Sequence, residues 1–97
     1  YPAEIESELS QMPTIKDCAV FGIPHEDFGE TLCAYVELEP NSTSTEQEIK
    51  DFLKDRLAAF KIPRVIKFSD TLPREDSGKI FKRKLRAPYW EKSGRQI

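Results

Sequence analysis

The chain has 97 residues, the size of a single domain. It is 38% hydrophobic and 33% charged, a balance typical of a soluble globular protein. No apolar stretch approaches the ~20 residues of a membrane span, and residues 1–4 have neither the basic region nor the apolar segment of a signal peptide.

Charge is divided unequally along the chain. Residues 1–60 carry 13 acidic and 4 basic side chains, a net charge of −9. Residues 61–97 carry 11 basic and 4 acidic side chains, a net charge of +7. The second part is therefore expected to face something anionic, such as phosphate groups.

The cysteine and histidine content predicts no metal site. Cys18 and Cys33 are the only cysteines and lack CxxC spacing, so neither a metal ligand set nor a disulfide framework is expected. Both fall in predicted strands, where a buried reduced thiol is the commoner state, and a cytoplasmic location fits this. The single histidine, His25, is interpreted as an exposed loop residue rather than a general base.

The first predicted element is a helix that begins near Pro2, a residue suited to the first helical position. Ile5, Leu9 and Met12 recur on one of its faces, and Pro13 ends it.

Two strands follow. Residues 17–23 form an apolar run that predicts a largely buried strand, and residues 24–30 are expected to form a loop. Residues 31–39 alternate between apolar and other side chains, which predicts a half-buried strand antiparallel to the first.

A second helix is predicted after the turn at residues 40–43. Ser44 and Thr45 are both plausible N-caps, with Gln47 and Glu48 three residues further on, as a capping box requires. The apolar stripe of this helix comprises Ile49, Phe52, Leu53, Leu57 and Phe60. Residues 61–63 are expected to stop it.

The remaining elements are a third short strand at 65–68, a polar loop at 72–78 and a basic helix at 79–86 before Pro88. Tyr89 and Trp90 are expected to pack the C-terminal tail against the body. The order αββαβ(α) predicts an α+β fold with a small, three-stranded, mainly antiparallel sheet packed with helices.

Residues 72–86 (LPREDSGKIFKRKLR) contain the chemically informative segment. Its SGK triplet is not a Walker loop, because Pro73 stands five residues before Gly78 and Ile80 replaces the Ser or Thr that binds magnesium. What remains is Lys79 in a glycine-containing loop, where a flexible ammonium can reach an oxyanion or phosphate outside its own domain. Gly78 is expected to supply the backbone geometry that aims Lys79.

This segment resembles the last core motif of the adenylate-forming superfamily, which includes acyl-CoA synthetases, luciferases and peptide-synthetase adenylation domains. Three other segments resemble the C-terminal domain of that superfamily, in the right order and spacing: YPAEIE at 1–6, AVFGIP at 19–24 followed by FGE at 28–30, and FKIPR at 60–64. The resemblance covers essentially the whole chain. The tail LRAPYW at 85–90 is most similar to bacterial fatty-acyl-CoA ligases.

The resemblance implies a two-step ligase. A carboxylate, expected to be a long-chain fatty acid, attacks the α-phosphate of Mg·ATP to give an acyl-adenylate and pyrophosphate, and the thiol of CoA then displaces AMP. By matching position, Lys79 contacts the carboxylate and phosphate oxygens in the first step. The small domain then rotates, and Lys79 leaves the site.

The same resemblance makes residues 1–97 a C-terminal lid domain without its N-terminal ATP- and acyl-binding domain, which is its expected partner. The arginine, the hinge residue and the glycine-containing segment that the resemblance leads us to expect just before Tyr1 are not part of residues 1–97. The isolated domain is therefore expected to be inactive and to bind neither ATP, CoA nor Mg²⁺ alone.

Other interpretations remain open for the basic residues. Lys61, Arg83 and Arg86 are candidates for contacts with CoA, or else parts of a solvated face. Within the superfamily, the acyl acceptor can instead be a carrier protein. A module of a different class would bind nucleic acid through residues 79–86, but the chain lacks the aromatic-rich strand or GxxG loop of such modules.

Overall fold

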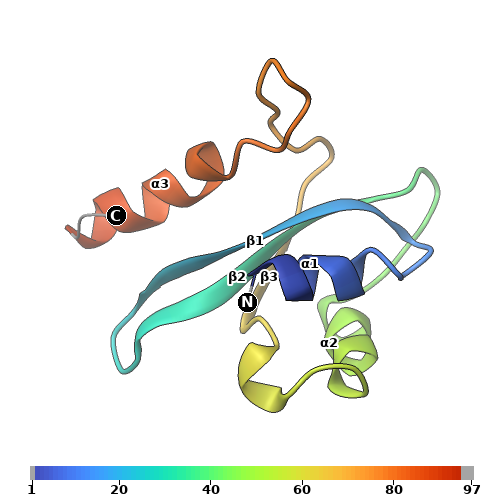
Figure 1. Ribbon diagram of the computed structural model, residues 1–97, viewed down its shortest axis with the longest axis horizontal. Coiled ribbons are helices and arrows are strands. Elements are labelled where there is room, and N and C mark those ends of the chain that lie inside the picture. The colour runs from blue at the N-terminus through green and yellow to red at the C-terminus, as the bar shows by residue number, and fades with distance from the viewer. Residues whose placement is uncertain (1, 95–97) are drawn as a thin grey trace.

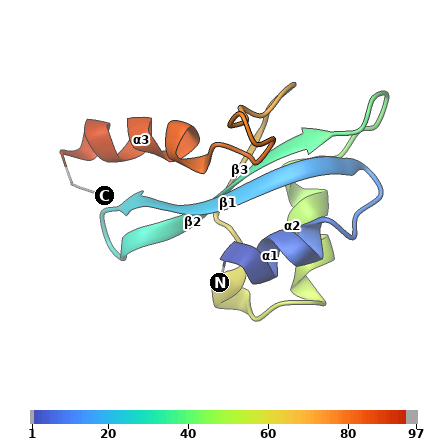
Figure 2. The ribbon, with the colours of Figure 1, turned by 45° about the horizontal axis from the view of Figure 1, so that its top comes forward.

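The computed structural model describes residues 2–94 and places a three-stranded sheet between two layers of helices (Figures 1 and 2). Helices α1 (Pro2–Leu9) and α2 (Glu46–Lys54) cover one face of the sheet, and α3 (Lys82–Ser93) covers the other. The α+β class and the predicted order of elements are confirmed. None of the helices within residues 2–94 has the length and apolar character needed to cross a membrane.

The sheet has the strand order β1-β2-β3, with β1 spanning Ile15–His25, β2 spanning Gly29–Leu38 and β3 spanning Val65–Phe68. The long pair β1–β2 is antiparallel, whereas β3 is parallel to β2. The parallel pairing follows from the connection through α2, which returns the chain to the same end of the sheet.

The two faces of the sheet carry separate apolar clusters. Side chains of α1 and α2, such as Ile5 and Leu53, pack on one face with Val20 and Val36. On the other face, α3 packs on the cluster formed by Phe21, Ile23 and Cys33. The prediction that β2 is half-buried was therefore wrong, because α3 covers the face that was expected to meet water.

The β1–β2 turn is tighter than predicted. Only residues 26–28 lie outside the strands, because Pro24 belongs to β1 and pairs with Glu30. A proline is tolerated there since β1 is an edge strand, where a missing amide donor need not break the ladder. His25 Nδ1 accepts hydrogen bonds from the amides of Asp27 (3.1 Å) and Phe28 (3.3 Å), so this histidine stabilises the turn.

Helix α2 has the predicted capping box, with Thr45 as its N-cap. The Thr45 hydroxyl accepts from the Glu48 amide at 3.1 Å, and the Glu48 carboxylate accepts from the Thr45 amide at 3.0 Å. The helix ends at Lys54, earlier than predicted, because the chain turns after it and Ala58 adopts an extended backbone before the short 3₁₀ helix at Ala59–Lys61. Phe60 is consequently 70% exposed and not part of the buried stripe.

Helix α3 differs most from the prediction. It begins at Lys82 rather than at residue 79, because Ile80 pairs with Arg74 in a hairpin. It also continues through Pro88 to Ser93 instead of ending before the proline. Contacts with the sheet hold its second half in place. Trp90 Nε1 donates to the Gly22 carbonyl at 2.9 Å, and the hydroxyls of Tyr89 and Tyr35 lie 2.7 Å apart. The predicted packing of the tail is thus confirmed.

Both cysteines are buried free thiols, as predicted. Cys18 faces α1, and Cys33 belongs to the cluster beneath α3, so they lie on opposite faces of the sheet. Burial raises the pKa of the Cys18 thiol to about 12 and that of Cys33 to about 11. Both thiols are therefore protonated and poorly reactive near neutral pH.

Candidate functional site

Lys79 lies on a β-hairpin formed by residues 73–81, which projects from the body as the orange loop at the top of Figure 1. The Phe81 amide donates to the Pro73 carbonyl at 2.9 Å, and the Glu75 amide donates to the Lys79 carbonyl at 2.8 Å. These bonds pair the entry stem, residues 73–75, with the exit stem, residues 79–81. The exposed Lys79 side chain is therefore carried by a hydrogen-bonded element and not by an irregular loop.

Gly78 completes the turn of this hairpin. Its amide donates to the Glu75 carbonyl at 2.8 Å, and its backbone has a φ of 91°. A tight turn followed by a left-handed residue is a common three-residue hairpin loop, and glycine takes that conformation without steric cost. A methyl group placed on Gly78 would meet no atom within 4 Å, so only the backbone conformation favours glycine here.

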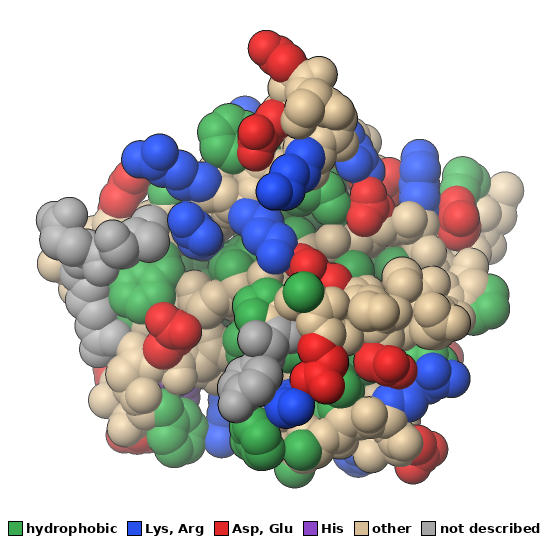
Figure 3. All heavy atoms as spheres, in the orientation of Figure 1, with side chains coloured by type: hydrophobic (Ala, Val, Ile, Leu, Met, Phe, Trp, Pro, Cys, Tyr) green, Lys and Arg blue, Asp and Glu red, His purple; other side chains and the backbone are tan. Residues whose placement is uncertain are grey.

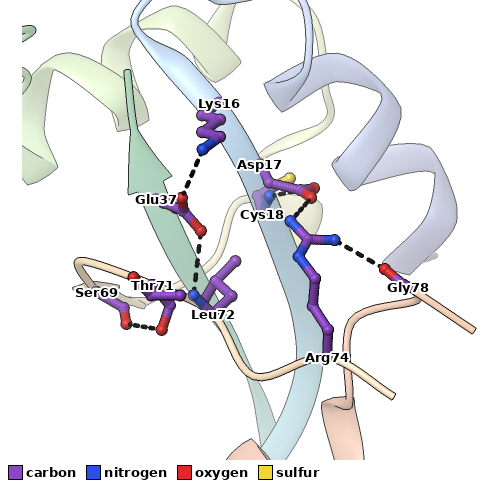
Figure 4. A network of polar contacts seen from close by, with 9 residues as sticks. All are labelled: Lys16, Asp17, Cys18, Glu37, Ser69, Thr71, Leu72, Arg74 and Gly78. Atoms are coloured by element: carbon purple, nitrogen blue, oxygen red, sulfur yellow. Dashed lines mark hydrogen bonds and ion pairs between the residues drawn. The ribbon is translucent and has the colours of Figure 1, made fainter. Parts of the chain in front are cut away.

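The entry to the hairpin is bound to the outer strand β1 by Arg74 (Figure 4). Its guanidinium donates from Nη2 to the Asp17 carboxylate and from Nη1 to the Gly78 carbonyl at 3.0 Å. Asp17 also accepts from the Cys18 amide at 2.9 Å, which fixes the carboxylate along the strand. One side chain thus connects β1 to the residue that precedes Lys79.

The exit of the hairpin leads into Lys82, the first residue of α3, which is bound to Glu6 of α1. Its ammonium lies 2.7 Å from Glu6 Oε2, and this oxygen also accepts from the Val20 amide at 2.8 Å. The carboxylates of Glu6 and Asp17 thus accept hydrogen bonds from amides of the edge strand β1. Their negative charge also discourages this strand from pairing with another chain. The entry is thus attached to β1 by an ion pair with Asp17, and the exit is attached to α1 by an ion pair with Glu6, which in turn binds an amide of β1.

A hollow of about 740 Å³ lies between the hairpin and the start of α3, and we call it the basic hollow. Its lining residues are Arg74, Glu75, Asp76, Ser77, Lys79, Ile80, Phe81, Lys82, Arg83 and Arg86. Figure 3 shows Lys and Arg side chains gathered between the projecting loop and α3. The structure thus brings Lys79 together with Arg83 and Arg86, two of the three predicted CoA-contacting residues.

The electrostatics of the basic hollow favour an anion. The first turn of α3 contains no acidic residue, and its N-cap, Phe81, makes no side-chain hydrogen bond to the helix. Amide groups at a helix N-terminus carry partial positive charge, which here adds to the surrounding cations. The Nε atom of Arg86 is buried without a hydrogen-bond acceptor among the described residues.

Lys61, the third predicted CoA-contacting residue, lies elsewhere. It belongs to the 3₁₀ helix, and its ammonium is 2.8 Å from a carboxylate oxygen of Glu4 in α1. It is absent from the lining of the basic hollow, and its contact with α1 places it on the face of the sheet opposite to α3. The structure therefore does not bring Lys61 together with Arg83 and Arg86.

A second hollow, which we call the Phe60 groove, was missed by the sequence analysis. It has a volume of about 710 Å³ and is lined by Phe28, Glu30, Thr31, Leu32, Gln47, Lys50, Lys54, Ala59, Phe60, Ile62, Pro63 and Arg64. The Arg64 guanidinium lies 4.6 Å from the centre of the Phe28 ring. Phe60 was assigned to the helix stripe by its spacing, although the adjacent Lys61 and Pro63 already indicated that the helix had ended.

Metal binding has no support in the described part of the chain. Within residues 2–94, no three His, Cys, Asp or Glu side chains gather closely enough to hold a metal ion.

Known proteins resemble this chain over the segments that contain the sequence motifs. Residues 4–79 match the family described as "AMP-binding enzyme C-terminal domain", in agreement with the resemblance of the four motifs. Tyr1, the first residue of the first motif, lies outside both the matched and the described residues.

Curated relatives are ligases of much greater length. The chain is 39% identical over 97 residues to the fatty acid–[acyl-carrier-protein] ligase ScoC of Streptomyces coeruleorubidus, covering 100% of this chain and 19% of ScoC. It is 42% identical over 89 residues to the long-chain-fatty-acid–CoA ligase FadD13 of Mycobacterium tuberculosis, covering 92% and 18%. The chain thus spans less than a fifth of the length of these relatives.

The fold also recurs in solved structures. The ATP-bound structure of MatB from Rhodopseudomonas palustris superposes with a TM-score of 0.87 at 43% identity, over 92% of this chain and 18% of that chain.

Proposed function

Because the chain belongs to the family of AMP-binding enzyme C-terminal domains, we propose that residues 1–97 are the C-terminal lid domain of a longer acyl-CoA synthetase. Its partner in this proposal is the N-terminal domain of the same enzyme, which holds ATP and the acyl substrate. The overall reaction joins a carboxylate to CoA and converts ATP to AMP and pyrophosphate.

The observation that carries the proposal is the placement of Lys79. An exposed ammonium on a hydrogen-bonded hairpin, beside other cations, is suited to enter a neighbouring active site and meet phosphate oxygens. During adenylation the carboxylate oxygen bonds to the α-phosphorus and pyrophosphate departs. Lys79 neutralises charge on these groups and fixes their approach, so its contribution is orientation and charge stabilisation.

The second step needs a thiol acceptor, for which CoA is our first candidate. The Phe60 groove supports it, because exposed aromatic rings beside Arg64 and Lys61 offer both stacking and charge. Arg83 and Arg86 offer a separate set of cations in the basic hollow, so the two sets are alternative sites for the phosphates of CoA. A carrier protein is the alternative acceptor, and the printed name of the relative ScoC supports keeping it.

The acyl substrate in this proposal is a fatty acid, long-chain by analogy with the printed name of FadD13. The described residues do not fit a Mg²⁺ site, since they contain no suitable cluster of acidic or histidine ligands. The ion that accompanies ATP would therefore be held outside residues 2–94. A cytoplasmic location stays a prediction.

The test measures the two half-reactions separately in the full-length enzyme. Lys79→Ala should reduce pyrophosphate release from ATP and fatty acid by about 10²-fold or more, as expected when a positioned charge is lost, and spare thioester formation from supplied acyl-adenylate. Lys84→Ala is the matched control, because it removes a lysine of the same basic segment that does not line the basic hollow. Unchanged adenylation in Lys79→Ala would refute the proposed role.

A further inference from the structure

The segment that leads into the hairpin crosses the sheet in a defined order. After β3 ends, residues 69–74 pass over β2 and then over β1 (Figure 4). The Leu72 amide donates to Glu37 Oε1 on β2 at 3.1 Å, and two residues later Arg74 reaches Asp17 on β1. Glu37 is only 6% exposed, so its carboxylate is a buried anchor for this segment.

The two anchors are directly opposed acidic residues. Asp17 and Glu37 are partners in the β1–β2 register. Like charges at such positions destabilise a sheet unless other groups compensate them. Here Glu37 is compensated by the Leu72 amide and by Lys16 at 3.4 Å, and Asp17 by Arg74. The acidic pair therefore acts as a docking point for the crossing segment.

Arg74 extends this anchoring to the turn of the hairpin. Its planar guanidinium binds Asp17 with one terminal nitrogen and the Gly78 carbonyl with the other. The Gly78 carbonyl belongs to the peptide group that joins Gly78 to Lys79. A lysine at position 74 would retain a charge but lack the rigid fork that makes both contacts at once.

The exposure of the pair indicates what it contributes. The side chains of Arg74 and Asp17 are 39% and 35% exposed. Ion pairs so accessible to water contribute about 0–1 kcal/mol to folding. A misplacement of about 1 Å in an active site, by contrast, can cost about 10²-fold in rate. A geometric role therefore fits this pair better than a stabilising one.

From these contacts we propose that Arg74 is a positioning residue for Lys79, acting through Asp17 and the Gly78 carbonyl. The inference rests on the proposed adenylation role of Lys79. Although Arg74 also lines the basic hollow, its role in this proposal is exerted through Lys79 and not by contact with the reacting groups. It holds the turn of the hairpin against β1, so that the ammonium of Lys79 enters the partner domain along a fixed direction.

The test is a double-mutant cycle in the full-length enzyme, with Arg74→Ala, Asp17→Ala and the double variant. Each single change should lower acyl-adenylate formation by about 10- to 100-fold, and the double change should lower it no further than Arg74→Ala alone. Thioester formation from supplied acyl-adenylate should stay at the wild-type rate. Arg74→Lys should recover the unfolding temperature but not the adenylation rate.

Arg56→Ala is the matched control. It removes an arginine–carboxylate pair of similar exposure, Arg56 with Glu8 at 3.3 Å, which joins the turn after α2 to α1 away from the hairpin. Both half-reactions should be unaffected by this change.

Three results would overturn the proposal. In the first, Lys79→Ala abolishes adenylation but Arg74→Ala leaves it intact. In the second, Arg74→Ala raises KM for ATP whereas Asp17→Ala has no effect, which means that Arg74 meets the substrate directly. In the third, both half-reactions fall together with the unfolding temperature, and Arg74→Lys restores all three, which means a structural role. If Lys79→Ala itself leaves adenylation unchanged, the proposed function fails first, and the cycle identifies that case separately.

Discussion

Gly78 offers a quantitative test of the link between backbone geometry and activity. Its φ of 91° is unfavourable for any residue with a β-carbon, yet an added methyl group would meet no atom within 4 Å. Gly78→Ala therefore introduces conformational strain without a clash, about 1–2 kcal/mol. Strain of this size lowers the population of the native turn relative to its relaxed form by a factor of about 5–30.

Adenylation by the full-length enzyme should fall by up to the same factor if the native turn is required to place Lys79. The assay is acyl-adenylate formation under single-turnover conditions, with thioester formation from supplied adenylate measured in parallel. Gly94→Ala is the control, because Gly94 ends α3 with a φ of 77° and also has no atom within 4 Å of the added methyl group. If Gly78→Ala adenylates as fast as Gly94→Ala, the turn does not determine the position of Lys79, and the reasoning is refuted.

Three further predictions concern stability. Because burial raises the pKa of Cys18 to about 12 and of Cys33 to about 11, the unfolded chain loses these protons first as the pH rises above about 9. The free energy of unfolding should therefore decline from about pH 9 upward, and it should decline less steeply in a Cys18→Ala/Cys33→Ala variant. Urea titrations at several pH values measure this, and the same pH dependence in the variant and the wild type would contradict the prediction. Thr45→Ala should lower the free energy of unfolding by about 0.5–2 kcal/mol, since it removes the cap of α2, and no change in the urea midpoint would count against the cap. Trp90→Phe removes the hydrogen bond to the Gly22 carbonyl, about 1 kcal/mol, and should speed amide exchange in α3 but not in α2; equal effects on both helices would exclude local docking.

Elements with local signals were predictable from the sequence. The capping box at Thr45 and Glu48 depends on residues three apart, and the structure contains it. The alternation in residues 31–39 identified β2, but it could not show that α3 covers the second face of the sheet, since that contact joins residues far apart in the chain. The burial of Cys33 and the packing of Tyr35 depend on this distant contact.

The start of α3 shows why the site itself was only partly predictable. Residues 79–86 look like a basic helix by composition, but the bond from the Phe81 amide to the Pro73 carbonyl and the bond from the Glu75 amide to the Lys79 carbonyl draw the first of them into a hairpin. The Asp17–Arg74 pair joins positions 57 residues apart, so no local pattern reports it. Lys79 was found by its motif, and the residues that hold its hairpin were found only in the structure.

The role of Lys79 can be tested most directly by chemical restoration of its charge. Lys79→Cys in the full-length enzyme should abolish adenylation, and aminoethylation of the new thiol should restore it, because the product carries an ammonium at nearly the original reach. Cys18 and Cys33 should escape the reagent, since both are buried with raised pKa values, and Lys79→Ala treated in the same way controls for any other thiol. Recovery confined to the aminoethylated Lys79→Cys enzyme is the predicted result. Full adenylation before aminoethylation would contradict the account.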